Sequence, residues 1–139
     1  MKIVVIDGQG GKMGKTLIEQ LIAGLPEKRA EIYAIGTNGN ATAAMMRAGA
    51  DYGATGENPV VVACRDADII VGPIGIVVAD SFLGELTPAM AVAIGQSRAV
   101  KYLLPMNRCH SQVIGVRELP MNDMVKLAVA QICEQVSQA

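Results

Sequence analysis

The stretch KIVVIDGQGGKMGK, residues 2–15, decides the fold of this chain. Residues 3–6 are all β-branched and run directly into glycines, which is typical of a strand buried on both faces of a sheet. Apolar residues recur at helical spacing over residues 17–25, and a second short apolar run over residues 32–35 ends at Gly36. Residues 2–36 therefore predict a strand, a glycine loop, a helix and a second strand.

The rest of the chain continues this alternation. Apolar periodicity and pairs of a capping residue with proline predict four more helices, over residues 41–48, residues 59–66, from Thr87-Pro88 to about Gln96, and residues 121–136. Asn58 is the expected cap of the helix over 59–66, for which a strand over 60–62 is the alternative. A strand is predicted over 69–71, and the glycine-rich stretch 49–56 leaves room for a short edge strand.

Two further strands are expected near the C-terminus, over Val100–Leu104 and Val113–Val116. The segment between them is too short for a crossover helix, so they are predicted to pair as an antiparallel hairpin. The predicted fold is therefore a three-layer α/β domain. Its sheet is mostly parallel, with one antiparallel edge strand near the C-terminus.

The composition limits the protein class. A chain of 139 residues with 51% hydrophobic and 18% charged residues predicts one domain over residues 1–139. So apolar a chain has few polar residues to cover its surface, which favours a homodimer. A net charge of −1 and only three tyrosines and one phenylalanine argue against nucleic acid as a partner. The first apolar run is too short to be a signal peptide or to span a membrane. Three widely spaced cysteines predict no disulfide framework and no metal site, and they agree with a cytoplasmic location.

The glycine loop is the main candidate for binding. It consists of Gly8, Gln9, Gly10, Gly11, Lys12, Met13 and Gly14. Free N–H groups and the positive end of the following helix favour a phosphate there, so Gly11→Asp is expected to abolish binding and leave the sheet folded. Asp7 repels a phosphate unless Lys12 or Lys15 neutralises it. The alternative is that the glycines only let the strand and the helix pack closely.

The spacing of this loop resembles the GxxGxMG turn of dihydrodipicolinate reductases and related NAD(P)-dependent dehydrogenases, with Gly8, Gly11, Met13 and Gly14 in register. That resemblance covers at most about the first forty residues and implies NAD or NADP as cofactor. Over its full length the chain is similar to a small bacterial family of Rossmann-like domains of unknown function. The motifs that carry this second resemblance are GQGGKMGK, TGEN, ADIIVGPIGIVVADS and AVAIGQS.

The end of the second strand bears on the choice of cofactor. NAD-binding domains place an acidic residue there, whereas this chain has Thr37 and Asn38, which tilts the prediction toward NADP. If no dinucleotide binds, residues 37–40 form only a loop and a helix cap. Gly72, Pro73 and Gly75 are expected to form the second wall of the same crevice, because ligands bind beyond the carboxyl ends of parallel strands.

The remaining candidates concern catalysis. His110 is the one histidine of the chain and follows the strand that ends at Leu104, which makes it a candidate acid–base residue, with a solvated surface group as the alternative. Gly14-Lys15-Thr16 resembles the end of a P-loop, but that motif requires glycine where Gln9 stands. The predicted function is binding of NAD(P) or another phosphate-bearing nucleotide, as a sensor or an oligomeric oxidoreductase. A ligand-free interaction module and a P-loop-like hydrolase are the alternatives.

Overall fold

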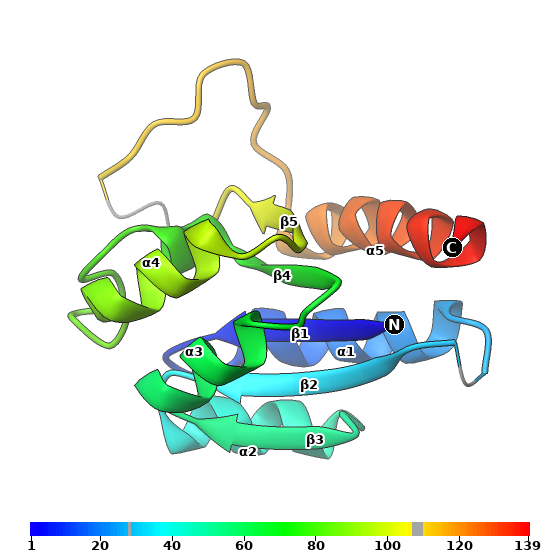
Figure 1. Cartoon of the computed structure of the whole chain (residues 1–139). Coiled ribbons are helices and arrows are strands. Elements are labelled where there is room, and N and C mark those ends of the chain that lie inside the picture. Colours follow the sequence, from blue (N-terminus) through cyan, green and yellow to red (C-terminus); the bar gives the residue numbers. More distant parts are fainter. Residues whose placement is uncertain (28, 107–109) are drawn as a thin grey trace.

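Five parallel strands form one central sheet in the order β3-β2-β1-β4-β5 (Figure 1). The structure is a computed structural model that describes residues 1–27, 29–106 and 110–139. The strands are β1 (Lys2–Asp7), β2 (Glu31–Gly36), β3 (Tyr52–Thr55), β4 (Ile69–Pro73) and β5 (Val100–Leu104). The predicted α/β class and three-layer architecture are confirmed.

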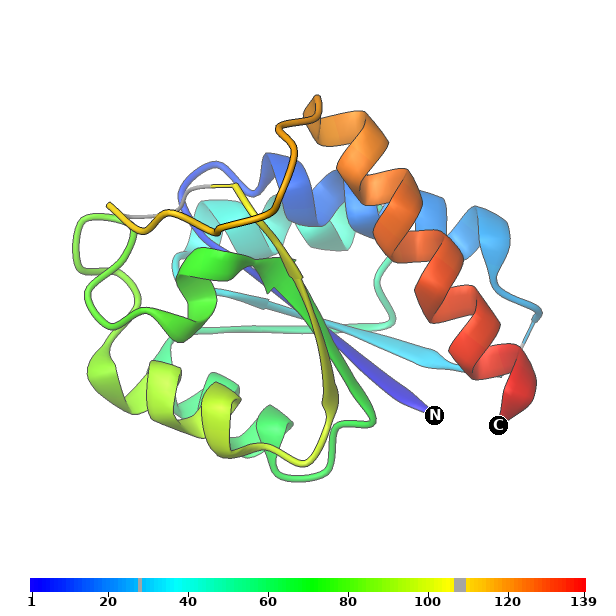
Figure 2. The same ribbon diagram turned by 90° about the horizontal axis from the view of Figure 1, so that it is seen from above.

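Helices cover both faces of the sheet. They are α1 (Lys12–Gly24), α2 (Gly39–Arg47), α3 (Glu57–Cys64), the 3₁₀ helix η1 (Ile74–Val77), α4 (Pro88–Gln96) and α5 (Met121–Gln138). Seen from above, α1, α2 and α5 lie on one side of the strands, and α3 and α4 lie on the other (Figure 2). The alternation of β1 explains this, because Ile3 and Val5 belong to one apolar core while Val4 and Ile6 belong to the other.

The predicted antiparallel hairpin is wrong. β5 pairs in parallel with β4, and α4 lies between the two strands as the crossover helix. Residues 113–116 form no strand, since Ile114 is 91% exposed and Gly115 has a φ of 83°. An exposed segment with a left-handed residue has no partner strand to bury it, so β5 is itself the edge of the sheet.

Two other boundaries differ from the expectation. α3 begins at Glu57 with Gly56 as its N-cap, so Asn58 lies inside the helix and does not cap it. β4 continues two residues beyond the predicted strand over 69–71 and includes Gly72 and Pro73. The predicted edge strand within residues 49–56 is present as β3, and Thr87 caps α4 as expected by accepting a hydrogen bond from the N–H of Met90.

Candidate functional site

Asp7 accepts hydrogen bonds from two of the amides that were expected to hold a phosphate. It ends β1, is 3% exposed, and accepts hydrogen bonds from the N–H groups of Gly8 and Gly14, each at 2.8 Å and each on a different carboxylate oxygen. Asp7 therefore does more than repel a phosphate, the role predicted from the sequence, because it also accepts hydrogen bonds from the loop. The carboxylate itself satisfies amides at the front of α1, where the helix dipole favours negative charge.

A second carboxylate, that of Glu85, accepts hydrogen bonds from three donors beside the loop. One oxygen of Glu85, Oε1, accepts hydrogen bonds from the N–H of Gln9 at 3.0 Å, the hydroxyl of Thr37 at 2.7 Å and the side-chain amide of Asn38 at 2.9 Å. These donors come from the loops that follow β1 and β2. They converge on a single point at the carboxyl ends of the strands, which is where ligands bind in open α/β sheets.

The two carboxylates have opposite pKa shifts. Burial is the largest influence on Asp7 and raises its pKa, against the hydrogen bonds from Gly14 and Gly8 that lower it. Burial also acts to raise the pKa of Glu85, but the hydrogen bonds from Thr37, Gln9 and Asn38 outweigh it and hold that pKa below the ordinary value. Glu85 is therefore ionised at neutral pH and is a strong acceptor.

The lowered pKa of Glu85 predicts an acid-sensitive contribution to stability. This contribution is present above the ordinary pKa of 4.5 and is lost as the pH falls through the lower value of the folded state. Asp7 has the opposite sign, because its raised pKa favours the folded state only in acid. We expect the wild type to lose more thermal stability than Glu85→Gln between neutral pH and pH values below 4.5. Identical pH profiles of the two proteins would contradict this assignment.

An open cavity of about 620 Å³ adjoins these donors. It is lined by Gln9, Asn38, Gly39, Asn40, Leu83 and Glu85. An apolar cavity of about 390 Å³ lies elsewhere, between β5 and α5, with Tyr102 and Leu127 among its walls. We place the candidate site at the first cavity, because backbone and side-chain donors from two strand ends meet there.

The glycines of the loop have different surroundings. A Cβ at Gly11 would lie 2.8 Å from the Cα of Ala41, and one at Gly14 would lie 2.5 Å from the sulfur of Met45. Gly10, by contrast, is exposed and has nothing within 4 Å of such a Cβ. Gly11 and Gly14 thus permit the close packing of α1 against α2, in agreement with the packing alternative at these positions.

The other predicted site residues divide into two groups. The Thr37 hydroxyl and the Asn38 amide share the Glu85 acceptor with the N–H of Gln9, and the Asn38 amide also donates to the carbonyl of Gln9 at 2.9 Å. Asn38 caps α2 by accepting a hydrogen bond from Ala41. The remaining ones are separated from that cluster or buried. Lys12 is exposed on α1, Met13 is buried in the core, and Gly72, Pro73 and Gly75 are buried in β4 and η1. A role of any of these residues in binding stays a prediction.

The catalytic candidate is exposed. His110 has a φ of 62°, and its role in catalysis stays a prediction. Its neighbours 107–109 lie outside the described residues.

The P-loop alternative finds no support. Lys15 is an exposed residue of α1 whose ammonium nitrogen lies 4.0 Å from Oε1 of Glu19, and the hydroxyl of Thr16 donates to the carbonyl of Lys12. No group of three potential metal ligands is present among the residues that the structure describes.

Glu85 is the residue of this site that the sequence did not predict. It lies in residues 78–86, which form turns and bends, and in this segment the Ser81 hydroxyl donates to the carbonyl of Val78 at 2.6 Å. No periodicity or spacing marks Glu85, since its partners lie 48 and 76 residues away in the chain.

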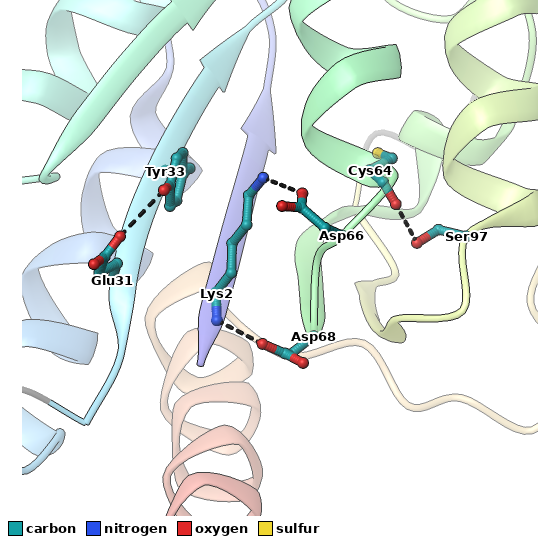
Figure 3. A network of polar contacts seen from close by, with 7 residues as sticks. All are labelled: Lys2, Glu31, Tyr33, Cys64, Asp66, Asp68 and Ser97. Atoms are coloured by element: carbon teal, nitrogen blue, oxygen red, sulfur yellow. Dashed lines mark hydrogen bonds and ion pairs between the residues drawn. The ribbon is translucent and has the colours of Figure 1, made fainter.

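The opposite ends of the strands carry a structural network (Figure 3). The N–H of Lys2 donates to Asp68 at 2.7 Å, and the Lys2 ammonium contacts Asp66 and the ring of Tyr33. Burial raises the pKa of the nearby Cys64 thiol to about 11, so the thiolate is absent at neutral pH. This network joins the starts of β1 and β4 and presents no reactive group.

The fold and the site define an α/β domain with a polar crevice at the carboxyl ends of its strands. The chain belongs to the family described as Domain of unknown function (DUF3842), which matches residues 2–137. No curated protein matches it. A similar solved structure is that of the dodecameric FMN-dependent Ubix-like decarboxylase from Escherichia coli O157:H7. The two are 13% identical, the match covers 99% of this chain and 94% of the other, and the TM-score is 0.47. No helix within the described ranges is long and apolar enough to cross a membrane.

The geometry of the loop corrects the prediction of NAD or NADP as cofactor. The physical reason is that two of the amides expected to hold a pyrophosphate, those of Gly8 and Gly14, donate to the buried carboxylate of Asp7.

Proposed function

We propose that this protein binds a small phosphate-bearing ligand, of mononucleotide size, in the crevice beside Gln9, Thr37 and Asn38. The observation that carries the proposal is the convergence of three donors on Oε1 of Glu85. A carboxylate oxygen and a phosphate oxygen accept the same hydrogen bonds, so the Glu85 oxygen indicates where a ligand phosphate would lie. The cavity of about 620 Å³ beside it supplies room for the rest of the ligand.

The character of the donors supports a phosphate in a partly solvated site. One donor is a backbone N–H, one a hydroxyl and one an amide, and none carries a charge. Asp7 adds negative charge below the loop, so the affinity for a free anion is expected to be modest. If the ligand also has a nucleoside group that contacts Asn40 and Leu83, these contacts would increase its affinity. The ligand is then recognised by its phosphate and its organic part together.

Thermal unfolding with matched ligands tests this proposal. AMP and FMN are expected to raise the melting temperature of the wild type, while adenosine and riboflavin, which lack the phosphate, are expected to leave it nearly unchanged. A ligand at 100 times its Kd adds roughly 2.7 kcal/mol to the free energy of unfolding, which is readily detected. Amide resonances of Gln9 and Asn38 should shift with the same ligands.

The proposal is contradicted if no phosphate-bearing ligand stabilises either the wild type or a variant without the Glu85 carboxylate. In that event the ligand-free interaction module becomes the better hypothesis. A homodimer stays a prediction from composition.

A further inference from the structure

We infer that Glu85 is a built-in competitor for the ligand of this crevice. Its carboxylate accepts the three hydrogen bonds that we assign to a ligand phosphate, and a ligand binds by displacing that side chain. This inference rests on the proposed function and goes beyond it, because it assigns to one residue the control of access to the site.

The loop that carries Glu85 is anchored at both ends. The N–H of Asp80 donates to the carbonyl of Leu86 at 2.7 Å, and the N–H of Leu86 donates to the carbonyl of Ser81 at 3.1 Å. Phe82 is 5% exposed and belongs to the core under α3 and α4. The loop backbone is therefore held in place over Gly8, where a Cβ would lie 3.0 Å from the Phe82 ring and 3.1 Å from Oε1 of Glu85.

The backbone of this loop adopts conformations that side chains disfavour. Asp80, Phe82 and Leu83 have φ values of 69°, 58° and 56°, in the left-handed region. Such conformations persist where the surrounding structure imposes them, and they concentrate at ligand clamps and switches. Leu83 at the tip is 100% exposed, so its conformation serves no packing of its own side chain. The loop holds Glu85 against the donors of Gln9, Thr37 and Asn38.

The Glu85 side chain can leave without the loop. It is partly exposed, and none of the ion pairs found within the described residues includes it. Rotation about its own bonds releases Gln9, Thr37 and Asn38 together, and a phosphate that takes its place restores hydrogen bonds to all three. Replacement of the Glu85 carboxylate by a phosphate therefore leaves no buried cation without a partner and no donor without an acceptor.

Competition has a measurable consequence. The apparent Kd equals the intrinsic Kd divided by the fraction of molecules in which the donors are free. Removing the competitor therefore tightens binding without adding any contact to the ligand. With inorganic phosphate and AMP as probes, Glu85→Ala is expected to bind at least tenfold more tightly than the wild type. Glu85→Gln keeps the shape of the side chain and loses its charge, so its affinity is expected to lie between those of the wild type and Glu85→Ala. It is also expected to fold if the alanine variant does not.

Glu19→Ala is the matched control. It removes the same charged group from an exposed position of α1 that contributes nothing to the crevice. Its affinity for both probes is expected to equal that of the wild type. If Glu19→Ala tightens binding as much as Glu85→Ala does, the effect is one of net charge and the inference is overturned.

Thr37→Val supplies a sharper signature. In the wild type this change weakens both the binding of the ligand and the contact of Glu85 that competes with it, because both accept a hydrogen bond from the same hydroxyl. The apparent Kd of the wild type is therefore expected to rise less than that of the Glu85→Ala background. In the Glu85→Ala background only the ligand loses the bond, so affinity is expected to fall severalfold. Equal effects in the two backgrounds would overturn the inference.

Hydrogen exchange gives a readout that needs no ligand. Without ligand, the Gln9 amide is expected to exchange more slowly in the wild type than in Glu85→Ala, since Glu85 accepts a hydrogen bond from this amide in the wild type. Equal exchange rates, or equal affinities of the wild type and both Glu85 variants, would overturn the inference while leaving the proposed function standing. Absence of binding in all three proteins would overturn both.

Discussion

Asp7→Ala is expected to lower the free energy of unfolding by about 2–4 kcal/mol, which is a large share of the stability of a domain of this size. The substitution removes the acceptor of two N–H groups, those of Gly8 and Gly14, at the buried start of α1. Each unsatisfied buried donor costs about 1–3 kcal/mol, and relief of the buried charge offsets part of that cost. Urea unfolding followed by circular dichroism measures the difference.

Asp7→Asn serves as the isosteric comparison. Its single amide oxygen can accept from Gly8 or from Gly14, and its NH₂ group then faces the other N–H. We expect a loss of about 1–3 kcal/mol, smaller than that of the alanine variant. A stability equal to the wild type in both variants would show that the carboxylate is not needed to hold the loop.

Gly11→Ala is expected to destabilise the protein by about 2–5 kcal/mol. Gly11 has a φ of 73°, which costs an L-residue about 1–2 kcal/mol. The added methyl group would also lie 2.8 Å from the Cα and 2.9 Å from the carbonyl oxygen of Ala41, so α1 and α2 must separate. Thermal unfolding should show a large decrease in melting temperature.

Gly10→Ala is the control for this change. It inserts the same methyl group one residue earlier, where nothing lies within 4 Å, and is expected to have little effect on stability. Similar losses in the two variants would contradict the packing explanation. The same geometry corrects the expectation that Gly11→Asp removes binding and leaves the sheet folded, because a larger side chain at this position disturbs the contact between the helices before any ligand is involved.

The β1–α1–β2 unit could be predicted from the sequence because its signals are local. Four β-branched residues, a glycine loop and a helical apolar stripe each depend only on neighbouring positions. The direction of β5 could not be predicted in this way. Whether Val100–Leu104 pairs with β4 or with residues 113–116 depends on which segment is buried, and the exposed Ile114 shows that the second one is not.

The candidate site was only half predictable. Gln9, Thr37 and Asn38 could be placed together because they follow neighbouring strands, whose carboxyl ends share one edge of the sheet. Their partner could not, since the Glu85 carboxylate reaches them from a loop whose left-handed backbone has no sequence signature.

The sequence by itself determined the class of fold, the order of most elements and the two strand ends that form the crevice. Only the tertiary structure decided that Asp7 and Glu85 satisfy the donors of that crevice. The physical reason is that periodicity reports which residues are buried, whereas a hydrogen bond between residues 76 positions apart depends on how the chain returns to the sheet.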